Sequence, residues 1–216
     1  MRIFLDTANI DKIKQGVKMG VVSGVTTNPT LAAKEGNTNY EALSKEICAI
    51  VPGPVSVEVL VEGVEPMIEQ ARQISAWAPN TVIKIPATTE GLEVTSAMAK
   101  EGIKVNFTLC FSLNQALLGA LAGAAYVSPF VGRLDDIGSD GMQLVKEIVD
   151  VFRHYQLPTE VIAASIRHTQ HCVAAAKAGA HIATVPYNVL AQMMSHPLTD
   201  IGISRFLSDW QHVSQR

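Results

Sequence analysis

The segment TVIKIPATTEGL, residues 81–92, decides the fold because it places a lysine inside a run of apolar, β-branched residues. In a strand, Ile83 and Ile85 point to one side. Val82 and Lys84 then point to the opposite side. An ammonium in such a strand loses its hydration unless it is paired, and a lowered pKa would make the amine nucleophilic near neutral pH. The plain alternative is a solvated lysine at a strand end.

The residues after the lysine predict where this strand ends. Pro86 cannot continue the ladder, and Thr88 or Thr89 can cap a helix that begins near Glu90. We therefore expect Lys84 at the C-terminal end of a strand that leads directly into a helix.

Length and composition fit one domain and restrict its partners. A chain of 216 residues, 48% hydrophobic and 17% charged, has room for one (β/α)₈ barrel with a large core. The net charge of −3 gives no basic surface for nucleic acid. Anionic small molecules would have to be bound by local arginines.

Targeting signals and metal motifs are missing from the sequence. The N-terminus, MRIFLDT, lacks a signal-peptide pattern and no apolar run could span a bilayer, so we expect a cytoplasmic protein without a membrane partner. Cys48, Cys110 and Cys172 lack CxxC spacing, and no HExxH accompanies His168 and His171, so we expect no metal site. No Gly-rich nucleotide motif follows a strand.

Short β-rich runs alternate with helical stretches along the whole chain, a pattern typical of a parallel sheet with crossover helices. The predicted strands are Arg2–Asp6, Val22–Thr26, Pro54–Val59, Thr81–Ile85, Ile103–Thr108, Ala125–Phe130, Glu160–Ser165 and His181–Val185. The predicted helices are Ile10–Met19, Asn39–Ile50, Val64–Trp77, Leu92–Lys100, Ser112–Ala122, Asp140–His154, Thr169–Lys177 and Val189–Met194. Eight such units predict a closed (β/α)₈ TIM barrel over residues 1–195, in a single domain.

The remaining residues, 196–216, predict an extra amphipathic helix. Its apolar stripe consists of Ile203, Phe206, Leu207, Trp210 and Val213. A barrel already has its ring of helices, so this helix needs another surface. It either folds back over its own barrel or packs on a neighbouring subunit, and we favour the second.

Polar side chains recur on one parity of the strands and gather toward their C-terminal ends. In VIAASIR, for example, Ser165 and Arg167 alternate with Ile162 and Ala164. In a barrel the inward side chains of these ends meet at the face that carries active sites. The predicted pocket contains Asp6, Asn28, Glu58, Lys84, Asn106, Thr108, Ser165 and Arg167.

Each of these residues also has a purely structural interpretation. An inward Asp or Asn can satisfy neighbouring polar groups in a core. The segment TTNP, residues 26–29, could be only a turn. Arg133 could pair with Asp135 or Asp136 on the surface.

The residue types together indicate a chemistry. A desolvated lysine forms a Schiff base with a ketone and supplies an electron sink for carbon–carbon cleavage. Carboxylates move protons, and amides and hydroxyls bind the substrate hydroxyls. Arginines bind phosphate in a bidentate manner, so the set favours a phosphorylated ketose.

Six motifs in this order resemble the transaldolase family, in the small-subunit branch that also contains the fructose-6-phosphate aldolases: LDTAN, GVTTNPT, IKIPATTEGL, NFTLCFS, YVSPFVGRLDD and AASIR. The resemblance implies a (β/α)₈ barrel without cofactor or metal. It also implies a homo-oligomer, by analogy a decamer of two five-membered rings in which the C-terminal helix reaches a neighbour.

The resemblance implies a role for each catalytic residue. Lys84 would be the Schiff-base lysine, and Asp6 would exchange the proton of the C4 hydroxyl as the C3–C4 bond breaks and forms. Glu58 and Thr108 would hold the water that relays protons. The residues that the resemblance places around the substrate are Thr26, Asn28, Asn106 and Ser128 at the dihydroxyacetone unit, and Arg133, Ser165 and Arg167 at the phosphate.

Two positions favour transfer over simple cleavage. Transaldolases of the family are similar to this chain in having Glu58 and Phe130, where the aldolases have Gln and Tyr. A phenol could protonate the enamine and release free dihydroxyacetone, whereas a phenylalanine cannot donate a proton. A transferase acting on sugar phosphates is expected, with a fructose-6-phosphate aldolase or a non-catalytic sugar-phosphate-binding barrel as alternatives.

Overall fold

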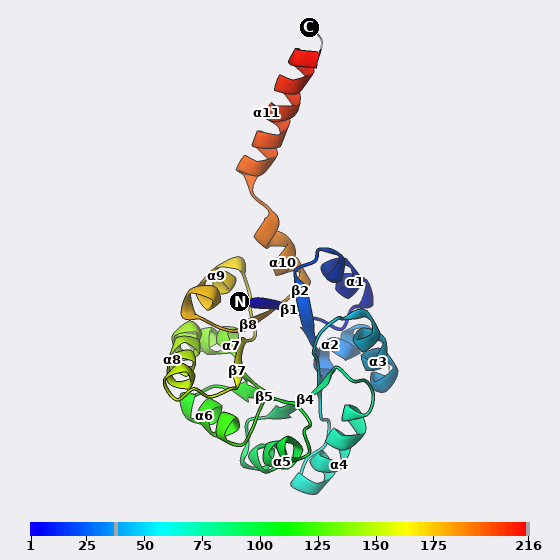
Figure 1. Ribbon diagram of the computed structural model, residues 1–216, viewed down its shortest axis with the longest axis vertical. Helices are drawn as coiled ribbons and strands as arrows, with labels where there is room; N and C mark the ends of the chain where they lie inside the picture. Colours follow the sequence, from blue (N-terminus) through cyan, green and yellow to red (C-terminus); the bar gives the residue numbers. More distant parts are fainter. Residues whose placement is uncertain (37–38, 215–216) are drawn as a thin grey trace.

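The computed structural model describes residues 1–36 and 39–214 and forms a closed barrel of eight parallel strands in chain order (Figure 1). The predicted (β/α)₈ barrel is confirmed. The strands are β1 Arg2–Asp6, β2 Val22–Thr26, β3 Val55–Glu58, β4 Thr81–Pro86, β5 Val105–Cys110, β6 Tyr126–Pro129, β7 Glu160–Ala163 and β8 Ile182–Val185.

Helices surround the barrel in Figure 1 and shield the outer face of the sheet. They are α1 Ile10–Lys18, α2 Pro29–Lys34, α3 Tyr40–Ile50, α4 Val64–Ser75, α5 Thr89–Lys100, α6 Leu113–Leu121, α7 Val131–Asp136, α8 Gly141–His154, α9 Thr169–Ala178, α10 Tyr187–Met194 and α11 Pro197–Ser214. The hydroxyl of Thr88 accepts a hydrogen bond from the Gly91 N–H, as the predicted cap requires, and α5 begins three residues before the predicted Leu92.

Two short helices, α2 and α7, were not predicted. Asn28 caps α2 by accepting a hydrogen bond from the Leu31 N–H, and Pro29 occupies the first turn. The interpretation of TTNP as only a turn is therefore wrong. Both helices follow strand ends, at the same end of the barrel as Lys84.

Strand parity divides the core into two parts. One parity points outward and packs with the helices in a single large cluster, as Leu5, Ile83 and Val127 do. The other points into the barrel, where Phe4, Val82, Tyr126, Ile162 and Ile182 form a separate apolar cluster. Where a strand carries both kinds of inward residue, the apolar one comes first, as Phe4 precedes Asp6 and Val82 precedes Lys84, so the C-terminal ends are left for polar groups.

The seventh strand departs from the prediction. Ile162 belongs to the inward cluster, so the regular parity of this strand would turn Ala164 inward and Ser165 outward. The strand ends at Ala163, and Ser165 has φ = 58°. This left-handed residue breaks the alternation, so Ser165 reaches the pocket by a turn and not by strand parity.

The C-terminal helix α11 projects away from the barrel in Figure 1. Its apolar side chains are exposed, including Ile203, Leu207 and Phe206, the last at 73%. The alternative that this helix folds back over its own barrel is therefore wrong. The side chain of Val213, and residues 215–216, lie outside the described part of the chain. No described helix is long and apolar enough to cross a membrane.

The inward layer predicts a sensitive position at Gly24. A Cβ there would lie 2.5 Å from the ring of Phe4, which fills the barrel interior. We expect Gly24→Ala to lower the free energy of unfolding by about 1–3 kcal/mol, measured by urea denaturation. Gly202→Ala is the control because nothing lies within 4 Å of that position. An equal, small effect of both substitutions would contradict the packing of Phe4 against Gly24.

Candidate active site

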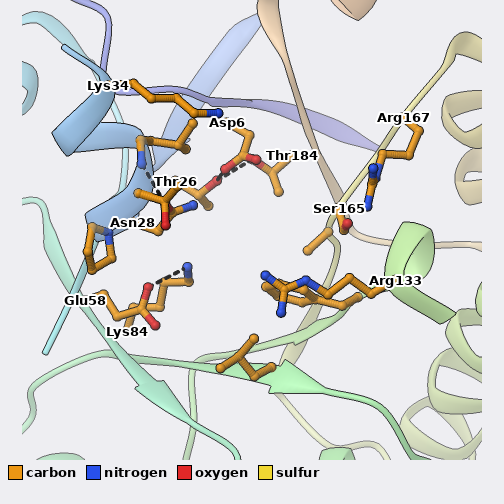
Figure 2. Close-up of a pocket in the computed structure, with 16 residues that line it drawn as sticks. Asp6, Thr26, Asn28, Lys34, Glu58, Lys84, Arg133, Ser165, Arg167 and Thr184 are labelled. Atoms are coloured by element: carbon orange, nitrogen blue, oxygen red, sulfur yellow. Dashed lines mark hydrogen bonds and ion pairs between the residues drawn. The ribbon is translucent and has the colours of Figure 1, made fainter. Parts of the chain in front are cut away.

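A cavity of about 460 Å³ opens at the C-terminal ends of the strands (Figure 2). The predicted site residues that line it are Asp6, Thr26, Asn28, Glu58, Lys84, Phe130, Arg133, Ser165 and Arg167. The other three predicted residues, Asn106, Thr108 and Ser128, are fully buried and do not line the cavity.

Lys84 lies inside the barrel and is only 6% exposed, so the solvated strand-end alternative is wrong. Its Nζ donates to Glu58 Oε2 at 3.0 Å and to the carbonyl of Thr27 at 3.3 Å. The pair follows from the register, because Glu58 and Lys84 are directly opposite on β3 and β4. Tyr40 supports it by accepting a hydrogen bond from the Glu58 N–H.

Asp6 lies across the pocket from this ion pair. Its carboxylate accepts a hydrogen bond from the Thr26 hydroxyl at 2.9 Å, and the hydroxyls of Thr26 and Thr184 are 2.6 Å apart. Burial raises the pKa of Asp6, against the opposing effects of the Lys84 charge and the Thr26 hydrogen bond. A carboxyl group with a raised pKa is a stronger base than an ordinary aspartate, so it can accept a proton and return it.

A buried polar layer lies among the same strands. Asn106 donates to the Ser56 hydroxyl at 3.0 Å and accepts from Ser128 at 2.6 Å, which fixes the orientation of its amide. The Thr108 hydroxyl has no hydrogen-bond partner among the described residues, although it is fully buried. A buried water would satisfy this hydroxyl.

The opposite side of the pocket carries two arginines. Figure 2 shows Arg133 extending into the cavity, and its Cζ lies 5.3 Å from the centre of the Phe130 ring. Within the described residues Arg133 forms no ion pair, so the alternative interpretation, a surface pairing with Asp135 or Asp136, is wrong. Asp136 instead pairs with Arg167 at 2.8 Å. In the view of Figure 2, Ser165 lies between Arg133 and Arg167.

Sequence reasoning missed several residues that line the cavity. Thr184 shares the inward parity of Ile182, so the rule applied to the other strands would have found it. Lys34 lies on α2, whose N-cap and proline are helix-start signals. Leu109 has φ = 55° within an irregular β5–β6 pairing, and nothing in its residue type predicts this bulge.

Metal ligands do not gather in the described part of the chain. Within residues 1–36 and 39–214, no group of three or more His, Cys, Asp or Glu side chains could hold a metal ion. The ring centres of His168 and His171 lie 3.8 Å apart with the ring planes tilted by 45°, and His171 pairs with Asp135. Burial raises the pKa of the Cys110 thiol to about 11, so this cysteine is a poor nucleophile.

The sequence was compared with known protein families. Residues 3–216 match the family described as Transaldolase/Fructose-6-phosphate aldolase. The chain belongs to this family. The resemblance inferred from its six motifs is therefore confirmed at the level of the whole family.

Individual relatives span the full chain. A protein of Dehalococcoides mccartyi named "Probable transaldolase" is 63% identical over 216 residues, all of both chains. A protein of Caldicellulosiruptor saccharolyticus with the same name is 58% identical over 217 aligned residues, again with both chains fully covered. Among solved structures, the thiamine phosphate pyrophosphorylase of Pyrococcus furiosus aligns with a TM-score of 0.59 at 14% identity over 85% of each chain. This last similarity concerns the fold alone.

Because Asp6 is buried, we expect its replacement by a neutral side chain to raise the stability of the protein and to lower its activity. The favourable contribution of the protonated carboxyl is complete below the ordinary aspartate pKa, about 4, and is lost as pH rises through the raised native value. Asp6→Asn should therefore have a higher Tm than the wild type at about pH 8, with the difference shrinking toward about pH 4.

The same substitution should lower kcat by at least about 100-fold, because an amide cannot exchange the proton. Thermal unfolding across this pH range and steady-state kinetics measure the two effects. Asp150→Asn, at an exposed aspartate on α8, is the control and should change neither. A Tm for Asp6→Asn that falls below the wild-type value as pH rises would contradict the raised pKa.

Proposed function

We propose that the chain is a transaldolase of the small-subunit branch. It would transfer a dihydroxyacetone unit from sedoheptulose 7-phosphate or fructose 6-phosphate to glyceraldehyde 3-phosphate or erythrose 4-phosphate. The observation that carries the proposal is the buried Lys84–Glu58 pair, facing Asp6 within a pocket that has two arginines on its other side. The relatives named probable transaldolase support it.

The first chemical steps use Lys84 and Glu58. Because Nζ and Oε2 are 3.0 Å apart, the ammonium can give a proton to the carboxylate and become a neutral nucleophile. The amine adds to the C2 ketone of the donor. The protonated Glu58 then helps the carbinolamine oxygen leave as water, and a Schiff base remains. A water held by the unpaired Thr108 hydroxyl would relay these protons.

Carbon–carbon cleavage uses Asp6. Its carboxylate takes the C4 hydroxyl proton as the C3–C4 bond breaks, the bonding electrons pass into the Schiff base, and an aldehyde leaves. The enamine then attacks the acceptor aldehyde, and Asp6 returns the proton to the new hydroxyl oxygen. The raised pKa of Asp6 supports this alternation, because the same group must act as base and acid.

Polar groups on both sides of the lysine would hold the substrate. We assign Thr26, Asn28, Asn106 and Ser128 to the dihydroxyacetone unit, the last two as a buried pair that fixes the pocket wall. We assign Arg133, Ser165 and Arg167 to the distal phosphate. The phosphate would thus lie across the pocket from Asp6, as the positions of these labelled residues in Figure 2 allow.

A fructose-6-phosphate aldolase is the second candidate, and Phe130 argues against it. The Phe130 ring lines the pocket and carries Arg133 on its face, so it offers no proton to the enamine. The enamine would therefore persist until an acceptor aldehyde arrives. This reasoning favours a transferase over a lyase.

The cellular setting and assembly belong to the same proposal. We infer a cytoplasmic enzyme of the non-oxidative pentose phosphate pathway and a homo-oligomer, by family resemblance a decamer. The exposed apolar side chains of α11 support packing on a neighbouring subunit, because a lone helix would leave them in water.

Chemical trapping tests the Schiff base. Incubation with fructose 6-phosphate and borohydride should attach a reduced dihydroxyacetone unit to Lys84, detected by peptide mass spectrometry. Lys84→Ala should give no adduct and lose transfer activity by several orders of magnitude. Lys146→Ala, at an exposed lysine of α8, should behave as the wild type. Retained activity in Lys84→Ala would instead favour the non-catalytic sugar-phosphate-binding barrel.

A phenol at position 130 tests the choice between transfer and cleavage. Phe130→Tyr should increase release of free dihydroxyacetone, assayed without acceptor, by about tenfold or more, because the hydroxyl can protonate the enamine. Phe111→Tyr is a matched control, since this ring contacts Phe130 edge-on but does not line the pocket. Wild-type release of dihydroxyacetone as fast as transfer would favour the aldolase.

A further inference from the structure

The two arginines assigned to phosphate come from different segments. Arg133 lies on α7, and Arg167 lies in the connection between β7 and α9. Two guanidinium groups can bind one phosphate only if their separation is fixed before the ligand arrives. The contacts between these two segments therefore affect the affinity of the pocket for phosphate.

Backbone contacts join the start of α7 to the β7–α9 connection. The N–H of Val131 donates to the Ala164 carbonyl at 3.0 Å, and the N–H of Gly132 donates to the Ser165 carbonyl at 3.1 Å. A Cβ on Gly132 would lie 2.3 Å from that carbonyl oxygen and 2.7 Å from Arg167 Nε, so only glycine allows this approach. These bonds stop at Ser165, two residues before Arg167.

His171 makes the contact that continues this connection to Arg167. The backbone N–H of Arg167 donates to His171 Nδ1 at 3.3 Å. His171 Nε2 lies 2.9 Å from Asp135 Oδ2 on α7, so the neutral ring that accepts at Nδ1 donates at Nε2. The other Asp135 oxygen accepts from the Gly141 N–H at 3.0 Å. The imidazole is thus a bridge between Arg167 and α7, with its tautomer fixed by both partners.

We propose that His171 is a positioning residue, which in its neutral form holds Arg167 at a fixed place relative to Arg133 and thereby sets the affinity of the pocket for a phosphate group. The inference rests on the proposed function only in naming a sugar phosphate as the ligand. The exposed Arg167–Asp136 ion pair acts at the guanidinium, but it lies at the surface and is weak. The His171 side chain is only 12% exposed, so water competes little for its hydrogen-bonding groups.

The charges around His171 favour its neutral form. The groups that face it are Asp135 on α7, Arg167 in the connection and His168 at the start of α9. Burial and then His168 lower the pKa of His171, and Arg167 acts in the same direction, while Asp135 opposes them. Protonation would place a second N–H on the ring, directed at the N–H of Arg167. Acid should therefore release Arg167 from the bridge.

Two substitutions separate the acceptor function of His171 from its bulk. His171→Asn keeps an oxygen near the Nδ1 position, so it should retain the bond to the Arg167 N–H, but it has no donor at the Nε2 position and loses the contact with Asp135. His171→Phe keeps an aromatic ring next to His168 and loses both polar atoms. His154→Phe, at an exposed histidine of α8, is the control.

Acceptor kinetics give the first measurement, with fructose 6-phosphate held at saturation. His171→Phe should raise KM for glyceraldehyde 3-phosphate by about tenfold and leave KM for unphosphorylated glyceraldehyde within about twofold of the wild type. His154→Phe should stay close to the wild type with both acceptors, and His171→Asn should raise KM for glyceraldehyde 3-phosphate less than His171→Phe does, because it keeps one of the two bonds. An equal rise of both KM values in His171→Phe would overturn the proposal, since it would indicate general damage to the pocket.

Direct binding of inorganic phosphate gives a measurement independent of turnover. Calorimetric titration should show a Kd about fivefold or more higher for His171→Phe than for the wild type, with the Kd of His171→Asn between the two. The wild type should also lose affinity relative to His171→Asn as pH falls from about 8 to about 5, since only the wild type protonates at this position. Because phosphate itself titrates in this pH range, the ratio of the Kd values of the two proteins is compared at each pH, and the titration of phosphate cancels in this ratio.

The two proposals can fail separately. Absence of dihydroxyacetone transfer in the wild type, with the phosphate affinities as expected, would overturn the transaldolase proposal and leave the role of His171 intact. Phosphate affinities that are equal in the wild type and His171→Phe, and a pH profile shared by the wild type and His171→Asn, would overturn the positioning role.

Discussion

The interaction on which the rest of the structure depends is the ion pair between Lys84 and Glu58 inside the barrel. An ammonium that is 6% exposed is too costly to bury without a charged partner. Parallel pairing of β3 and β4 supplies one, because it sets Glu58 opposite Lys84 with the same inward parity. The pair keeps a reactive amine dry and leaves it next to a group that can take its proton.

The interior of the barrel is divided to accommodate this pair. Toward the N-terminal ends of the strands, Phe4, Val82 and Ile182 fill the barrel with apolar groups. Toward the C-terminal ends, hydroxyls and amides replace them. Several are held by neighbours, as Asn106 is held between Ser56 and Ser128. The apolar half provides the stability of a packed core, and the polar half can therefore be organised around charge.

Much of this arrangement could be predicted because alternation along a strand needs no knowledge of its partners. The parity of Asp6, Glu58 and Lys84 alone indicated a shared pocket. The rule failed where the backbone left the β region: Leu109 and Ser165 both have positive φ, which breaks the period of two. The residue types leucine and serine do not predict a positive φ, because the surrounding fold imposes this conformation.

The sequence by itself determined the barrel, the inward lysine and the family, since each depends on residue types at regular spacing. Only the tertiary structure decided which groups meet. It paired Asp136 with Arg167, brought Lys34 to the pocket, and placed His171 between Arg167 and Asp135. The reason is physical: periodicity fixes the direction of a side chain, whereas its partner depends on how separate segments approach in space.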